Sequence, residues 1–127
     1  MVAVTGIFSG MAVKDLDTAR TFYRDTLGLT VNDNPMSAID IALPQGGIVF
    51  VYPKEDHVPA TYTVLNLEVA DIDAAVHELT GKGVQFQIYE GARQDEHGIA
   101  RGKAANMGPD IAWFLDPSGN ILSVLSN

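Results

Sequence analysis

A pattern of apolar and acidic residues occurs twice in this chain, and it constrains the fold more than any other feature. The first copy is Val13, Asp15, Asp17 and Ala19, and the second, at a constant offset, is Val69, Asp71, Asp73 and Ala75. In each copy the first Asp is suited to cap the N-terminus of a helix, and the second lies near the positive end of the helix dipole. Gly28 and Gly83, one residue out of step, are suited to end the two helices. The repeat predicts an internal duplication.

The elements predicted around the two copies follow the same order. Helices at residues 15–28 and 71–81 carry apolar side chains at helical spacing. In the first half, strands are predicted at residues 7–13, 29–31, 36–43 and 48–52, with turns at 32–35 and 44–47. In the second half, strands are predicted at residues 62–69, 84–89, 110–115 and 121–125. The polar residues 53–60 contain two prolines and are predicted to link the halves.

The second half ends with a predicted β-hairpin. Residues 110–115 and 121–125 are apolar, aromatic or β-branched, and they flank a turn in which Pro117 presets φ and Gly119 or Asn120 can adopt a positive φ. The hairpin follows a segment, 90–109, that is longer than the connection it should match. Long loops in small domains either form lids and binding loops or are simply mobile. The sequence leaves both readings of this segment open.

Composition limits the classes of function. The chain has 127 residues, a formal net charge of −8 and no cysteine. Its length suits one domain with a core of its own, and the absence of cysteine excludes disulfides and thiolate chemistry. The negative charge argues against nucleic acid and is compatible either with a cationic ligand or with a merely solubilising surface. We expect no membrane segment and a cytoplasmic location, because the sequence contains no long apolar run and begins without a basic segment.

Four segments together resemble a known family. They are 13–17 (VKDLD), 22–29 (FYRDTLGL), 68–75 (EVADIDAA) and 114–120 (FLDPSGN). They are similar to signatures of the vicinal oxygen chelate superfamily, which includes glyoxalase I, bleomycin-resistance proteins and extradiol dioxygenases. The resemblance implies an α+β fold in a single domain, 1–127, with two βαβββ modules at about 1–53 and 61–127. It also implies curled sheets that form an open, barrel-like cleft for a ligand, and a homodimer as the functional unit.

The family's metal ligands have no counterparts in this sequence. The resemblance places the four ligand positions at Phe8 or Ser9, Val51, Val64 and Ser123. Apolar side chains cannot bind a divalent ion, and hydroxyl groups are weak ligands. His57, His77 and His97 lie in the predicted linker, helix and long loop, and the run Asp95-Glu96-His97 is better explained as a solvated turn. We therefore predict that the metal site is absent, and we expect no cofactor.

Aromatic and small polar residues are the candidates for lining the cleft, because alternate residues of a strand point to one face. The candidates are Ser9, Met36, Phe50, Tyr52, Tyr62, Phe86, Tyr89, His97, Arg101, Trp113 and Ser123. Such a cleft suits a small organic molecule, aromatic or cationic, held by stacking and burial without chemistry. Two alternatives remain open: a metal-independent enzyme that uses groups such as Tyr52, Tyr62, Glu68, His97 or Arg101 as acids and bases, and a protein-interaction module without a pocket.

Overall fold

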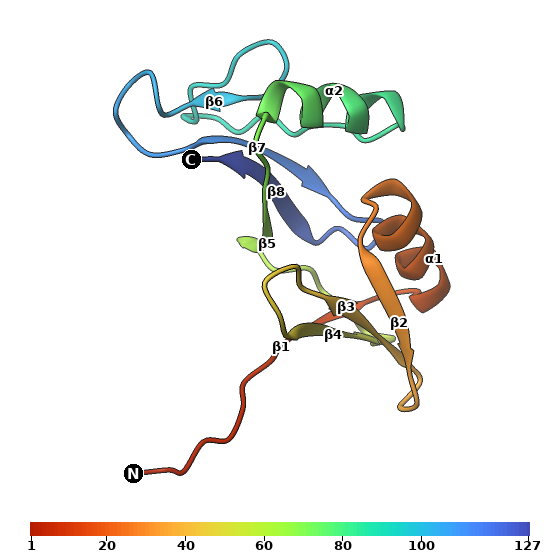
Figure 1. The fold of residues 1–127 in the computed structure, drawn as a ribbon. Helices are drawn as coiled ribbons and strands as arrows, with labels where there is room; N and C mark the ends of the chain where they lie inside the picture. The colour runs from red at the N-terminus through yellow and green to blue at the C-terminus, as the bar shows by residue number, and fades with distance from the viewer. The chain divides into compact units, whose positions relative to one another are not determined.

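The computed structural model describes residues 1–127 and divides into two compact units, Met1–Val58 and Pro59–Asn127. Each unit contains a four-stranded mixed sheet, and neither sheet closes on itself (Figure 1). Neither helical segment of the chain combines the length and the hydrophobicity that a membrane span requires.

The first unit contains β1 (Ser9–Val13), β2 (Thr30–Asn34), β3 (Ala38–Ala42) and β4 (Ile48–Pro53). The strand order in the sheet is β1-β4-β3-β2, with β1 parallel to β4 and the other neighbours antiparallel. The predicted order of elements is thus confirmed. The predicted turn at 32–35 is misplaced, because β2 continues through Asn34 and the reversal occurs at residues 35–37, where Ser37 has φ +58°.

The helix of the first unit is capped as predicted but does not remain a regular α-helix. The Asp15 carboxylate accepts hydrogen bonds from the backbone N–H groups of Asp17 and Thr18, and α1 (Leu16–Thr21) follows. The chain then widens into one π-helical turn, η1 (Phe22–Thr26), which Leu27 closes by donating to the carbonyl of Phe22. Gly28 adopts φ +71° and ends the helix.

The second unit repeats this plan. It contains β5 (Thr63–Glu68), α2 (Ile72–Gly81), β6 (Ala100–Arg101), β7 (Asp110–Leu115) and β8 (Ile121–Ser126), with the sheet order β5-β8-β7-β6 and β5 parallel to β8. The Asp71 carboxylate accepts from the backbone N–H of Ala74, and Gly83 follows the helix with φ +91°. The two units are therefore similar modules, as the repeat predicted.

The predicted strand at 84–89 is wrong. In this segment only Phe86 forms an isolated bridge, with Phe114, and the strand beside β7 comes instead from Ala100–Arg101. The backbone N–H of Tyr89 bonds to the side chain of Gln94 rather than to a strand. The outer strand of this sheet is consequently short and is supplied by the segment that we predicted to be a loop.

The predicted hairpin is confirmed, with β8 extending one residue further than expected. The Asp116 carboxylate accepts from the backbone N–H groups of Ser118 and Asn120 and from the Asn120 side-chain amide. Gly119 has φ +86°. These bonds organise the turn around one buried carboxylate.

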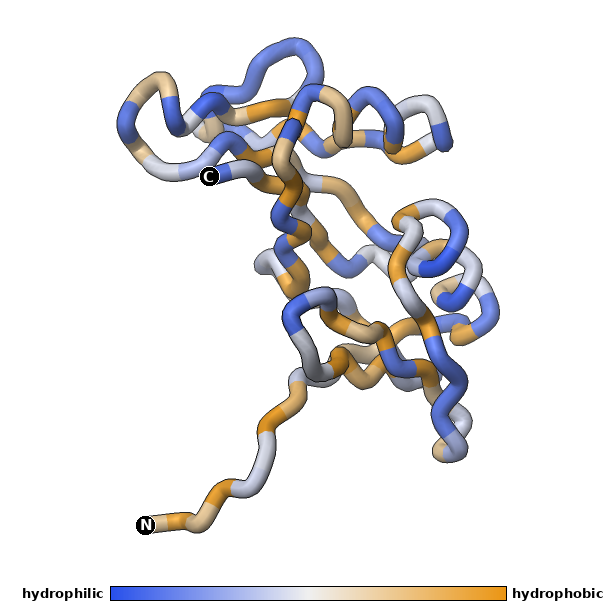
Figure 2. The backbone as a smooth tube through the Cα atoms, in the orientation of Figure 1, coloured by the Kyte–Doolittle hydropathy of each residue, from blue (hydrophilic) through white to orange (hydrophobic).

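The core of each unit lies between its helix and one face of its sheet. Buried side chains of the first unit include Val13, Tyr23, Ile39 and Val51, and those of the second include Ile72, Val76, Phe114, Leu122 and Val124. Figure 2 shows hydrophobic stretches along the strands, whereas the loop around residues 90–98 is largely hydrophilic. Each sheet is therefore left with a second face that its own helix does not cover.

Candidate functional site

The helix-free face of the first unit carries three aromatic rings. Phe50 and Tyr52 alternate along β4 with the buried Val49 and Val51, which face α1. The rings of Phe50 and Tyr52 are stacked, with centroids 5.8 Å apart and planes 26° apart. Phe8 lies edge-on to Phe50 at 6.3 Å. The three rings form a continuous apolar surface that remains partly exposed to solvent.

Small residues leave these rings accessible from the β1 side. In the parallel pairing of β1 with β4, Gly10 lies opposite Phe50 and Ala12 lies opposite Tyr52. Neither side chain is large enough to cover an aromatic ring. The residue composition of β1 therefore keeps the ring surface open within this unit.

A carboxylate lies beside the rings. Asp40 of β3 is the cross-strand partner of Phe50, and it is half-buried. The Asn34 side-chain amide donates to both carboxylate oxygens of Asp40, at 3.1 and 3.2 Å. No basic side chain forms an ion pair with Asp40. The helix-free face thus combines stacked rings with a negative charge that a ligand could neutralise.

The helix-free face of the second unit also combines aromatic and polar groups. Trp113 of β7 lies opposite Ser123 of β8, which in turn lies opposite Asn66 of β5. The Ser123 hydroxyl donates to the Asn66 side-chain oxygen at 2.6 Å and is fully buried. Tyr89 packs edge-on against Trp113, with ring centroids 5.6 Å apart. The polar groups on this face are already paired with one another.

A glutamine side chain holds Tyr89 in place. Gln94 Oε1 accepts from the Tyr89 backbone N–H at 2.8 Å, while its Nε2 donates to the carbonyls of Gln87 and Gly98 at 2.8 and 2.7 Å. The backbone N–H of Gln87 donates to the Trp113 carbonyl. One side chain therefore connects three points of the loop and fixes the ring that contacts Trp113.

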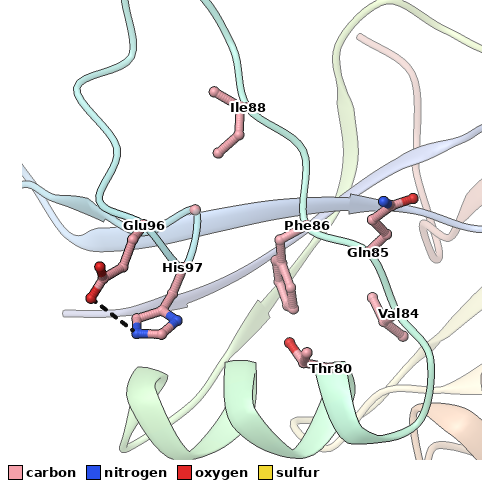
Figure 3. A pocket seen from close by; sticks show the side chains of 8 residues that line it. Thr80, Val84, Gln85, Phe86, Ile88, Glu96 and His97 are labelled. Carbon is pink, nitrogen blue, oxygen red and sulfur yellow. Dashed lines mark ion pairs between the residues drawn. The ribbon is translucent and has the colours of Figure 1, made fainter.

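The remaining predicted residues lie elsewhere. Ser9 is the cross-strand partner of Val49 rather than of Phe50, Met36 is exposed in the turn before β3, and Tyr62 is exposed just before β5. Phe86 contacts the buried Phe114 on the α2 side of the sheet, at 5.6 Å, and His97 lies near it (Figure 3). The structure thus brings together Phe50 with Tyr52, and separately Tyr89, Trp113 and Ser123.

Arg101 is held in a network of carboxylates. It donates to both oxygens of Asp73 and to Asp95, and Asp110 lies 4.0 Å away. These hydrogen bonds raise the pKa of Arg101, and the Arg101 guanidinium lowers the pKa of Asp73. Burial acts to raise the pKa of Asp95, but hydrogen bonds from Ile99, His97 and Arg101 outweigh it and lower that pKa. Arg101 therefore has a structural role, because it links Asp95 in the loop at residues 90–99 to Asp73 in α2.

The positions expected for metal ligands carry no imidazole or carboxylate. Val51 was aligned with the fourth-strand ligand, and that register is wrong, because Val51 is fully buried on the α1 side. The helix-free positions of β4 are Phe50 and Tyr52, and Ser123 is bonded to Asn66. No group of three or more His, Asp or Glu side chains lies close enough together to hold a metal ion.

Sequence reasoning missed Asp40, Asn34 and Asn66. The alternation in residues 38–42, with Ile39 and Ile41 on either side of Asp40, was a usable signal, because it places Asp40 on the face opposite the core. The register of β3 against β4 then brings Asp40 next to Phe50, and the sequence alone does not specify that register.

A family model matches nearly the whole chain, and solved structures share its fold. The family model of the glyoxalase/bleomycin resistance protein/dioxygenase superfamily matches residues 4–124. No curated protein matches the sequence significantly. Among solved structures, TnmS3, an antibiotic binding protein from Streptomyces sp. CB03234, is similar with a TM-score of 0.70 and 19% identity, over 99% of this chain and 98% of that one.

Two further structures give the same result. A putative glyoxalase family protein from Bacillus anthracis has a TM-score of 0.69 and 19% identity, over 100% of this chain and 99% of that one. The oxidase ChaP-H2 has a TM-score of 0.68 and 19% identity, over 99% and 95%. At these identities the likeness shows the fold, which hosts both binding and redox functions.

Proposed function

Because the chain belongs to the glyoxalase/bleomycin resistance protein/dioxygenase superfamily, we propose that it binds a small organic molecule without a metal ion. The proposed ligand is a planar aromatic cation, and the proposed site is the helix-free face of the first unit. TnmS3, which is similar in fold, is an antibiotic binding protein, and this is compatible with the proposed class of ligand.

The observation that carries the proposal is the position of Asp40 beside the stacked rings of Phe50 and Tyr52. A flat ligand gains from stacking on aromatic side chains, and a cation gains further from the ring faces and from an unneutralised carboxylate. Asn34 fixes the carboxylate with two hydrogen bonds, so little ordering is required when a ligand arrives. An anionic ligand would instead be repelled, and the net charge of −8 would add to that repulsion.

The donor set supports binding without a metal. Phe50, Tyr52 and Ser123 replace the side chains that a divalent ion requires, and Asp40 provides a single carboxylate on its face. Binding by this site would therefore be insensitive to chelators. Two hydrogen bonds from Asn34 already occupy Asp40, which fits the role of a fixed charge better than that of a proton carrier.

The proposal is tested with proflavine, a planar cation, and 2-anthracenecarboxylate, a planar anion of similar size. We expect proflavine to raise the melting temperature, with or without EDTA, by an amount that grows with the logarithm of its concentration above its dissociation constant, and 2-anthracenecarboxylate to have no effect. The variant Asp40→Asn should bind proflavine about tenfold more weakly, as expected for one lost charge-assisted contact.

Glu55→Gln provides the matched control, since it removes the same charge from an exposed position outside the sheet of the first unit. Equal weakening in both variants would show that net charge alone attracts the dye. Chelator-sensitive binding would contradict a metal-free site. Conversion of proflavine or of any other bound compound to a product would favour the enzyme alternative.

A further inference from the structure

A second concave site lies on the other side of the second unit, next to α2. It consists of two adjoining cavities of about 260 and 350 Å³, which share Thr80 and His97 as lining residues. Figure 3 shows the first cavity, with Phe86 and Val84 on one side, Glu96 and His97 on the other, and Thr80 of α2 between them. The second cavity continues along α2 past Val76 and His77 to Ile99.

This groove is distinct from the helix-free face. Phe86 forms a bridge with Phe114, whose buried side chain points to the α2 side of the sheet, whereas Trp113 next to it points to the opposite side. The groove contains none of the residues assigned to the proposed dye site, and it lies wholly within the second unit.

The walls of the groove are fixed by the fold. Val84 and Ile99 are buried, and Phe86 packs edge-on against Phe114. The Asp95 carboxylate accepts from the backbone N–H groups of His97 and Ile99, both at 2.9 Å, which sets the loop that carries His97. A cavity with fixed walls requires little rearrangement when a ligand binds.

The charges of the groove favour cations. Its charged lining residues are Asp73 and Glu96, and neither a lysine nor an arginine lines it. Asp73 is neutralised by Arg101 at 2.6 Å. The Glu96 carboxylate lies 3.6 Å from His97 Nε2, a contact that becomes an ion pair only when the imidazole is protonated. Glu96 is largely exposed and forms no ion pair with a lysine or arginine, so it is the carboxylate of the groove that a cation can approach.

We propose that the groove between α2 and residues 84–99 binds a small single-ring cation, an arylalkylamine or an aromatic amidine, with its ring against Phe86 and its charge at Glu96. The apolar side chains of Val84 and Phe86 provide the surface for the ring, and the hydroxyl of Thr80 and the imidazole of His97 provide polar contacts. Each cavity lies near the low end of the volumes of ligand sites, which favours a small guest.

The probe for this site is benzamidine, with benzyl alcohol and benzoate as neutral and anionic counterparts. Titration followed by ¹H–¹⁵N correlation spectra should give saturable shifts at Thr80, His97 and Gly98 with benzamidine. Benzyl alcohol should bind about tenfold more weakly, and benzoate should not bind. Equal binding of benzoate, or shifts without saturation, would overturn the proposal.

Two variants of α2 locate the site. Thr80 lines both cavities, so the large side chain of Thr80→Trp would occupy the groove and should abolish the shifts. Glu78→Trp, on the same helix but outside the groove, should preserve them. Thr80 is exposed, so a folded variant is expected, and its circular dichroism spectrum should match that of the parent. The benzamidine shifts at Thr80, His97 and Gly98 should saturate at the same concentration in Glu55→Gln, which removes one negative charge outside the groove. Weaker shifts in Glu55→Gln would show that net charge attracts benzamidine, and shifts that persist in Thr80→Trp would show that benzamidine binds elsewhere; either result would overturn the proposal.

Discussion

The guanidinium of Arg101 donates hydrogen bonds to both carboxylate oxygens of Asp73, at 3.0 and 2.6 Å, and thereby ties β6 to α2. The same side chain bonds to Asp95, so three segments of the second unit meet at one cation. The loop that contains Asp95 also carries Gln94, which positions Tyr89, and His97, which lines the α2 groove. Arg101 thus holds in place the loop that contributes both to the contact of Tyr89 with Trp113 and to the α2 groove.

Removing this anchor should loosen the loop without unfolding the sheet. In Arg101→Gln we expect faster hydrogen exchange at the backbone amides of His97 and Ile99, because Asp95, which accepts from both, loses its basic partner. Arg93→Gln is the control, since Arg93 is exposed in the same loop and forms no ion pair. Unchanged exchange in Arg101→Gln would show that the backbone bonds alone hold the loop.

The same carboxylates predict how stability depends on pH. The pKa values of Asp73 and Asp95 are lowered in the folded state from their ordinary value of 3.8. Groups with a depressed pKa contribute stability that is fully present above their unfolded pKa and is lost as the pH falls through the folded pKa. Urea unfolding should therefore show a free energy that is constant near pH 6 and decreases below about pH 4.

The variant Asp95→Asn isolates one contribution to this acid sensitivity. It should be less stable than the parent at pH 6, and the difference should shrink toward pH 3, where the parent also begins to protonate Asp95. A difference that grew as the pH fell would mean that the pKa of Asp95 is raised rather than lowered on folding.

The two helix caps should be equivalent. Asp15→Ala and Asp71→Ala each remove a carboxylate that accepts from first-turn N–H groups, and each should decrease the free energy of unfolding by about 1 kcal/mol. Asp71→Asn should retain most of the stability, because Asn caps helices about as well as Asp. A large loss in the Asn variant would point to charge rather than to the hydrogen bond.

The hairpin turn should depend on Gly119. Its φ of +86° is strained for any side chain, and a Cβ there would lie 3.2 Å from Cγ of Pro59. Gly119→Ala should therefore decrease the free energy of unfolding by about 1–2 kcal/mol. Gly81→Ala, at the end of α2 with no atom within 4 Å of the added Cβ, should be neutral or stabilising in the same urea titration.

Local rules were sufficient for the caps and the hairpin. Asp15 and Asp71 accept from backbone N–H groups within three residues of themselves, and the Gly119 N–H donates to the carbonyl of Asp116. A short stretch of sequence therefore contains all the information for these contacts. The two similar modules were equally predictable, because the repeat places the same local signals in the same order.

Contacts between distant strands were not predictable in the same way. Residues 84–89 have the composition of a strand, but β7 pairs instead with Ala100–Arg101. Phe86 forms only an isolated bridge with Phe114, and its side chain lies on the α2 side of the sheet. Period-two reasoning paired Phe50 with Tyr52 without identifying their face, and only the register of β3 places Asp40 beside them. The pairing of strands depends on the whole sheet rather than on a short stretch of sequence. Because the pairing decides which side chains lie next to one another on a face, the sequence alone did not identify the candidate sites.

The central claim is that the rings of Phe50 and Tyr52, next to Asp40, form the binding surface for an aromatic cation. Intermolecular nuclear Overhauser effects between proflavine and the aromatic protons of the chain test this claim most directly. We predict effects from the dye to Phe50 and Tyr52, and much weaker effects in Asp40→Asn at a dye concentration near the dissociation constant of the parent. Effects confined to other side chains, or of undiminished intensity in that variant, would contradict the claim.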